Sequence, residues 1–103
     1  MRVIFSVNGA PIRLTEERLK HIYVHHPELD KSEDNLAETI NNPDVVQKGD
    51  TGTLLAIKKF DKTPVTENKY LVVVYKEISQ SDGFVLTAYY SNVLRRRQII
   101  WKN

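Results

Sequence analysis

The spacing of apolar residues changes once along the chain, and this change limits the folds that the sequence can adopt. On residues 16–41 apolar side chains recur every three or four positions, the spacing of helices that bury one face. From Val45 onward they alternate every second residue in runs rich in β-branched and aromatic side chains, as expected for strands. The strand runs are separated by loops of hairpin length or slightly more, which favours sequential antiparallel pairing. The sequence therefore predicts an α+β fold, with a helical N-terminal half packed on an antiparallel sheet.

Capping signals define two helices. Thr15 can cap a helix over about residues 16–26, and two glutamates follow it near the positive end of the helix dipole. Pro27 ends this helix because it disfavours helical geometry at the residue before it. Ser32 followed by two acidic residues predicts a second helix over about 33–41, which Asn41-Asn42-Pro43 ends.

Strands are predicted on both sides of the helices. Before them, residues 2–7 and 11–14 flank Asn8-Gly9, a turn pair that suits a short hairpin. After them we expect a sheet of four strands or slightly more. The predicted strands are Val45-Val46, Thr53 to Phe60, Tyr70 to Ile78, Phe84 to Ser91 and a terminal segment near Gln98 to Trp101, and the longest separator is Asp61 to Asn68.

Length and composition indicate one domain spanning residues 1–103, because 103 residues can close one hydrophobic core but divide poorly into two. The absence of cysteine excludes a disulfide framework and a thiolate metal site, and it is typical of a reducing compartment. No apolar run reaches the length of a secretory signal or a membrane span. We therefore expect a cytoplasmic protein without membrane association.

Charge is distributed unevenly between the two halves. Residues 1–50 contain six Lys or Arg and nine Asp or Glu, whereas residues 51–103 contain nine and four, so the net charges are −3 and +5. A basic half favours a polyanionic partner, because each cation near a phosphate displaces condensed counterions. A solvated, lysine-rich sheet surface would give the same charge distribution, so both interpretations remain open.

The first helix carries a polar cluster. Arg18, His21 and His25 fall on one side of it, away from the apolar stripe, and could face a ligand together or form a solvated face. His21 and His25 have the spacing of a metal pair, but Ile22 follows His21 where a metalloprotease motif has glutamate, and no third ligand is evident, so we expect no metal site. His26 lies on the apolar stripe, where it could fix the chain exit or reach the rim of the sheet.

The strands offer hydroxyls and cations. Alternation puts Thr87, Tyr89 and Ser91 on one strand face, where hydroxyls suit a phosphate or a ribose. Lys58 and Lys76 each emerge from an otherwise apolar strand face, where a lysine commonly extends to the sheet edge. The run Arg95-Arg96-Arg97 follows an aromatic segment, a combination that suggests nucleic acid binding without being diagnostic of it.

A series of short motifs resembles one nuclease family. The motifs are Arg18-x-x-His21-Ile22, His26-Pro27-Glu28, Asn42-Pro43-Asp44, the strand from Tyr70 to Lys76, and Phe84-Val-Leu-Thr87-Ala88-Tyr89. Their order and spacing, over about Leu14 to Trp101, resemble the phage-associated branch of the barnase/EndoU/colicin/RelE-like nucleases, the PBECR group of the BECR fold. The resemblance implies a helix-then-four-strand α+β fold and a metal-independent ribonuclease without a cofactor, of the kind found among toxins and phage proteins.

The resemblance also implies the site residues. Carried over position by position, they are Arg18, His21, His26, Lys76, Thr87 and Tyr89, whereas His25 falls at a variable position of the family pattern. We expect His21 and His26 to act as acid and base in 2′-hydroxyl attack, which leaves a 2′,3′-cyclic phosphate. Arg18 and Lys76 would stabilise charge on the phosphorus, and Thr87 and Tyr89 would hold the phosphate or ribose. We also expect three further cations to bind the RNA substrate, namely Lys58, Arg95 and Arg96.

Two other readings stay open. One is a catalytically silent module that holds RNA or a protein on the same basic, hydroxyl-rich face, and the other is a protein-interaction domain, such as a homodimer through an edge strand. An RNase toxin in the cytoplasm would also require a neutralising partner, an antitoxin or immunity protein.

Overall fold

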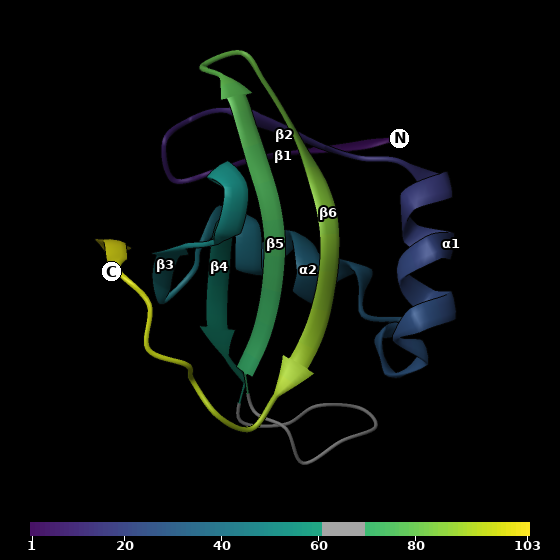
Figure 1. Ribbon diagram of the computed structural model, residues 1–103. Helices are drawn as coiled ribbons and strands as arrows, with labels where there is room; N and C mark the ends of the chain where they lie inside the picture. The colour runs from purple at the N-terminus through teal and green to yellow at the C-terminus, as the bar shows by residue number, and fades with distance from the viewer. Residues whose placement is uncertain (61–69) are drawn as a thin grey trace.

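The computed structural model describes residues 1–60 and 70–103, so the predicted loop from Asp61 to Asn68 lies outside the described residues. Figure 1 shows the arrangement of the elements. In chain order they are β1 (Arg2–Phe5), β2 (Pro11–Leu14), α1 (Glu16–His25), the 3-10 helix η1 (Pro27–Leu29), α2 (Glu33–Asn41), β3 (Val45–Lys48), the 3-10 helix η2 (Asp50–Gly52), β4 (Leu54–Lys59), β5 (Tyr70–Ser79), β6 (Asp82–Ser91) and β7 (Ile99–Lys102). The predicted α+β class and both helices are confirmed.

All seven strands join one sheet in the order β1-β2-β6-β5-β4-β3-β7. The sheet is larger than the expected four strands or slightly more, because the N-terminal hairpin joins it, while the predicted terminal strand is β7. The pairing is antiparallel except between β2 and β6, where Ile12 lies opposite Gly83 in a parallel pair. A Cβ on Gly83 would lie 2.6 Å from Ile12 Cδ1, so glycine at this position lets β2 approach β6.

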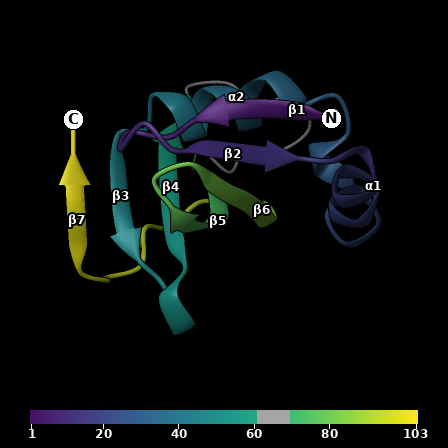
Figure 2. The same ribbon diagram turned by 90° about the horizontal axis from the view of Figure 1, so that it is seen from above.

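Helix α2 covers one face of the sheet, and α1 stands beside β6 (Figures 1 and 2). The main core lies between the sheet, both helices and the β1–β2 hairpin. From the strands it includes Leu71, Val73 and Tyr75 of β5 and Ala88 and Tyr90 of β6. We call this side of the sheet the helix-side face.

The helices begin as the sequence indicates, but with different caps. Thr15 Oγ1 accepts a hydrogen bond of 3.1 Å from the backbone N–H of Arg18, so the predicted cap is confirmed. The side chain of Ser32 makes no capping hydrogen bond. Its buried hydroxyl instead accepts a hydrogen bond of 3.2 Å from the Tyr90 hydroxyl and ties the start of α2 to the sheet.

The opposite side, which we call the open face, is covered by no helix of the described residues. It carries a second, smaller apolar cluster of Val45, Leu55, Ile57 and Val72. Residues 92–98, here called the crossing segment, lead from the end of β6 past this cluster to β7 on the far side of β3. None of the helices in the described ranges has the length and apolar composition needed to span a bilayer.

Candidate functional site

The register of the central strands places the predicted hydroxyl residues on the open face. Val72 lies opposite Ile57 on one side and Tyr89 on the other, and Val74 lies opposite Thr87. Tyr89 and Val74 both pack against the open-face apolar cluster. The predicted shared face of Thr87 and Tyr89 is therefore confirmed, and Ala88 and Tyr90 lie within the core. A register shift between Thr87 and Val85 interrupts the alternation of β6, so Val85 instead of Leu86 enters the core.

Lys76 also belongs to the open face. It follows Tyr75, which is fully buried in the main core, and successive strand residues point to opposite faces. Its half-buried side chain lies beside η2, since a Cβ built on Gly52 would be 3.8 Å from Lys76 Cε. Lys76 is therefore at the end of the open face where β3 and β4 are joined.

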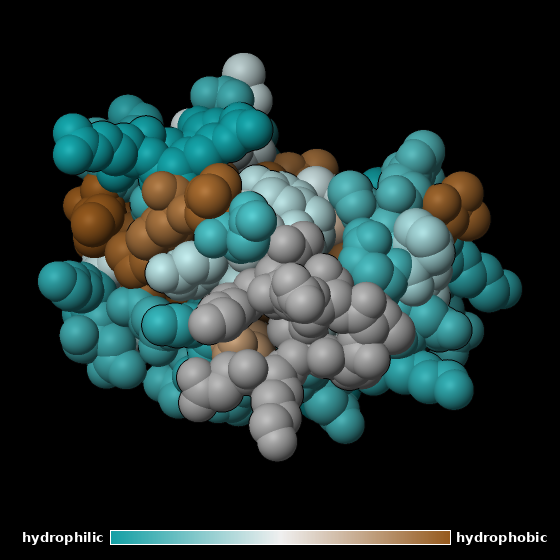
Figure 3. Space-filling model, turned by 90° about the horizontal axis from the view of Figure 1, so that it is seen from below, coloured by the Kyte–Doolittle hydropathy of each residue, from teal (hydrophilic) through white to brown (hydrophobic). Residues whose placement is uncertain are grey.

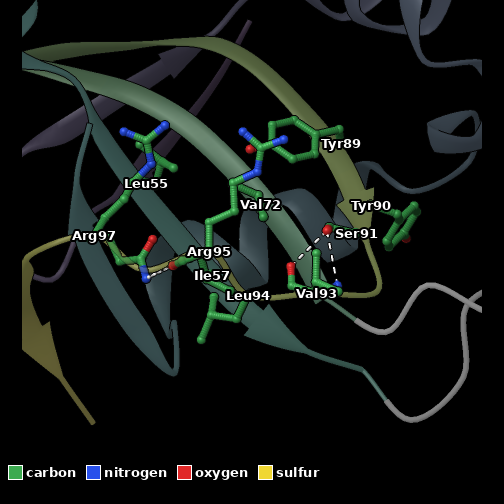
Figure 4. A pocket seen from close by; sticks show the side chains of 11 residues that line it. Leu55, Ile57, Val72, Tyr89, Tyr90, Ser91, Val93, Leu94, Arg95 and Arg97 are labelled. Atoms are coloured by element: carbon green, nitrogen blue, oxygen red, sulfur yellow. Dashed lines mark hydrogen bonds between the residues drawn. The ribbon is translucent and has the colours of Figure 1, made fainter. Parts of the chain in front are cut away.

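A pocket of about 410 Å³ occupies the open face between the sheet and the crossing segment (Figure 4). Its floor is apolar and its rim is polar and cationic. It is lined by Gln47, Leu55, Ile57, Val72, Tyr89, Tyr90, Ser91, Val93, Leu94, Arg95 and Arg97. In the close view the side chain of Arg95 extends from the crossing segment toward Tyr89, and that of Arg97 lies over Leu55.

Specific hydrogen bonds hold the crossing segment in this position. The buried side chain of Gln47 in β3 donates from Nε2 to the carbonyl oxygen of Arg95 at 3.0 Å. The backbone N–H of Lys48 donates to the carbonyl oxygen of Gln98 at 2.8 Å. Arg97 Nη1 lies 3.3 Å from Asp50 Oδ1. The backbone of Arg95 is therefore held by β3 and the side chain of Arg97 by Asp50, whereas Arg95 itself is exposed.

His26 reaches the rim of the sheet at the pocket's β6 side. As the C-cap of α1, it leaves the helix with non-helical backbone angles, and its backbone N–H donates to the carbonyl oxygen of Ile22. The His26 ring centre lies 6.1 Å from that of Tyr89. His26 Nδ1 also lies 3.4 Å from Glu28 Oε1, so a protonated imidazole would have a carboxylate beside it.

Arg18 lies against the same strand. Its Nη1 donates to the carbonyl oxygen of Leu86 at 3.3 Å, which fastens α1 to the β6 edge next to Thr87. The arrangement thus brings together one histidine, one α1 arginine, the β6 hydroxyls and the arginines of the crossing segment.

Lys58 and Arg96 lie apart from this group, and His21 adjoins it only through Arg18, with which it lines a separate pocket of about 290 Å³. His21 is exposed on α1, where its ring packs edge-on against His25 with centres 4.5 Å apart. Lys58 lies on the helix-side face, and its Nζ donates to the carbonyl oxygen of Asn42 at 2.9 Å, at the end of α2. Arg96 lines a different groove, beside β7. Lys58 and Lys76 therefore lie on opposite faces of the sheet, so one RNA strand on the open face would not reach both.

Three residues in or near the pocket were not predicted as site residues. Glu28 belongs to the motif His26-Pro27-Glu28 but was given no role, and its place near His26 depends on the turn of η1. Gln47 is a buried amide in an apolar strand, a signal that does point to a specific hydrogen bond. Arg97 belongs to the predicted basic run, but its place at the rim depends on Asp50.

Among residues 1–60 and 70–103, no group of three or more His, Cys, Asp or Glu side chains could hold a metal ion. The cationic and hydroxyl groups around the pocket can bind an anion directly. No family model matches the chain, and no curated protein or solved structure is detectably similar to it.

Proposed function

We propose that this domain is a metal-independent endoribonuclease that binds an RNA strand on the open face and cleaves it by attack of the 2′-hydroxyl. The products would be a 2′,3′-cyclic phosphate and a free 5′-hydroxyl. One observation carries the proposal: the His26 imidazole lies near Glu28 and beside Tyr89, at the edge of a pocket walled by Arg95 and Arg97.

Binding follows from the chemistry of the pocket. Arg95 and Arg97 offer planar donors that suit phosphate oxygens. Tyr89 offers an aromatic ring, and the apolar floor beside it can receive a nucleobase. A pocket that combines cations with an aromatic ring suits single-stranded RNA better than a duplex, whose bases are stacked away from the protein.

Cleavage requires a proton acceptor for the 2′-hydroxyl, a donor for the leaving 5′-oxygen and groups that stabilise charge on the phosphate. Nδ1 of His26 lies near Glu28, so we assign proton transfer to Nε2. Neutral His26 would accept the proton, and protonated His26 would donate it. Tyr89 is the candidate second proton carrier or phosphate donor, while Lys76, Thr87 and Arg95 would hold the phosphate. The role that the family resemblance implies for His21 would require the substrate to extend onto the exposed side of α1.

The test is an RNA cleavage assay with purified protein, a chelator and a single-stranded substrate. We expect His26→Ala to lower the rate about 10²–10⁴-fold, as for loss of a proton-transfer group. His25→Ala is the matched control, because it removes a neighbouring exposed imidazole and should leave the rate unchanged. His21→Ala then shows whether the outer side of α1 participates. Equal rates for wild type and His26→Ala would contradict the assignment of His26.

A second candidate is an RNA-binding module without cleavage, and one observation favours it. His26 is the single histidine that adjoins the pocket, so the described site has fewer imidazole proton carriers than the sequence suggested. RNA binding that weakens with salt, with no cyclic phosphate formed, would support this candidate. In that case His26→Ala would leave RNA affinity nearly unchanged.

A further inference from the structure

The outer edge of β7 is exposed and unusually apolar for an edge strand. Among the described residues, β7 has β3 as its one hydrogen-bonded neighbour, so its other side is open. Ile99 and Ile100 at the start of this strand are 52% and 44% exposed. Natural edge strands are usually protected by charge, proline or a covering segment, because an open edge can pair with another chain. This edge is therefore a candidate interaction surface.

A groove of about 430 Å³ runs beside the same edge. It shares the crossing segment with the open-face pocket but extends toward β7 instead of across β4 and β5. It is lined by Gln47, Leu94, Arg95, Arg96, Arg97 and Ile99. Figure 3 shows hydrophobic surface on this side of the molecule, next to strongly hydrophilic residues. The groove thus combines hydrocarbon with a rim of guanidinium groups.

The charge at this edge is of one sign. Residues 92–103 contain three arginines and one lysine and no acidic residue. Arg97 is paired with Asp50, but Arg95 and Arg96 have no carboxylate within ion-pair distance among the residues the structure describes. An extended partner segment that carries carboxylates could pair with these arginines and with the open backbone of β7.

We propose that the β7 edge and its groove bind an extended segment of a partner protein in which acidic and apolar residues alternate. Backbone pairing with β7 would continue the sheet, as in strand addition. Because strand side chains alternate between the two faces, the apolar residues of such a segment would meet Ile99 and Leu94 while its carboxylates would reach the arginines.

A second copy of this chain fits the edge less well. Pairing of β7 with another β7 would bring two acid-free basic segments together. The other open edge, β1, has the sequence Arg-Val-Ile-Phe and also lacks an acidic residue. RNA fits less well too, because the exposed groups beside the arginines are isoleucine and leucine side chains instead of aromatic rings on which bases stack.

The test uses a synthetic peptide of roughly eight residues that alternates glutamate and valine, a typical strand length. We expect saturable binding to the full chain and added hydrogen-exchange protection of β7 amides. A peptide that alternates lysine and valine should not bind. Ile99→Asp should weaken the acidic peptide at least about tenfold, because it adds a negative charge to the groove and removes an apolar contact. Val24→Asp, which replaces an exposed apolar residue on α1, should leave the affinity unchanged.

Four results would overturn the proposal. They are the absence of saturable binding up to roughly 1 mM peptide, equal affinity for Ile99→Asp and wild type, protection of β7 amides by an RNA oligonucleotide but not by the peptide, and protection of β7 amides by self-association without peptide. None of them depends on RNA cleavage, so this test and the test of the proposed function can fail separately.

Discussion

The two faces of the sheet are made from the same strands but differ in what covers them. On β5, Leu71, Val73 and Tyr75 enter the core under α2 and the hairpin, whereas Val72 and Val74 pack in the smaller open-face cluster. The helix-side face is closed by two helices, and the open face has only the crossing segment over part of it. The alternation of one strand thus separates the residues that stabilise the fold from those available to a ligand.

The largest expected difference between the faces is in stability, and two buried leucines test it. Leu71→Ala should lower the free energy of unfolding by about 2–5 kcal/mol, because it leaves a cavity in the closed core. Leu55→Ala should cost at least about 1 kcal/mol less, because its cavity adjoins the open pocket and the crossing segment can settle into it. Urea denaturation measures both values. An equal or larger loss at Leu55 would mean that the open face belongs to the core.

Lys58 and Lys76 carry the same charge on opposite faces of the sheet, so they test which face binds RNA. Lys76→Ala should weaken RNA binding several-fold to about tenfold and reduce the salt dependence by about one counterion. Lys58→Ala removes the same charge from the helix-side face and should leave RNA binding nearly unchanged. Fluorescence anisotropy across a salt series measures both. A larger effect at Lys58 would place the RNA on the wrong side for the proposed site.

Two buried tyrosines of the helix-side face differ in whether the hydroxyl has a hydrogen-bond partner. Tyr90→Phe removes a hydrogen bond to Ser32 and should destabilise the protein by about 1 kcal/mol. The buried Tyr75 hydroxyl has no hydrogen-bond partner among the described residues. Tyr75→Phe should therefore be neutral or stabilise by up to about 1 kcal/mol, because it removes an unsatisfied buried polar group. Thermal or urea unfolding of both variants would show whether the signs differ as expected.

The smallest expected effect is a pH dependence at Tyr75. Burial, with a further contribution from the charge of Glu77, raises the pKa of this phenol well above its ordinary value. Above pH of about 10 the unfolded chain loses this proton while the folded protein keeps it, so folding stability falls as pH rises. At pH of about 10.5 the loss should be about 0.8 kcal/mol relative to neutral pH. It should be absent in Tyr75→Phe, and an identical alkaline decline in both proteins would contradict this origin.

Local features of the fold could be predicted from the sequence because their causes are local. The Thr15 cap and the turn at Asn8-Gly9 depend on neighbouring residues, and both form as expected. The shared face of Thr87 and Tyr89 follows from alternation alone, since nothing interrupts β6 between them.

Features that depend on distant contacts could not be predicted. The parallel pairing of β2 with β6 depends on the fit of Ile12 over Gly83, and the pairing of β7 with β3 is set across more than fifty positions of sequence. Alternation along one strand also cannot show whether a residue on another strand points to the same face of the sheet. Lys58 and Lys76 look equivalent in the sequence, but the strand register places them on opposite sides.

The path of the crossing segment affects the order in which the parts of the fold can form. On a ribosome, β1 to β6 emerge before β7 does, and these elements contain every residue of the main core. The arginine wall is positioned through β3 and η2, so it can settle only after the chain has passed β6 and turned back. A chain that folds as it emerges can therefore close its main core before the open-face pocket forms.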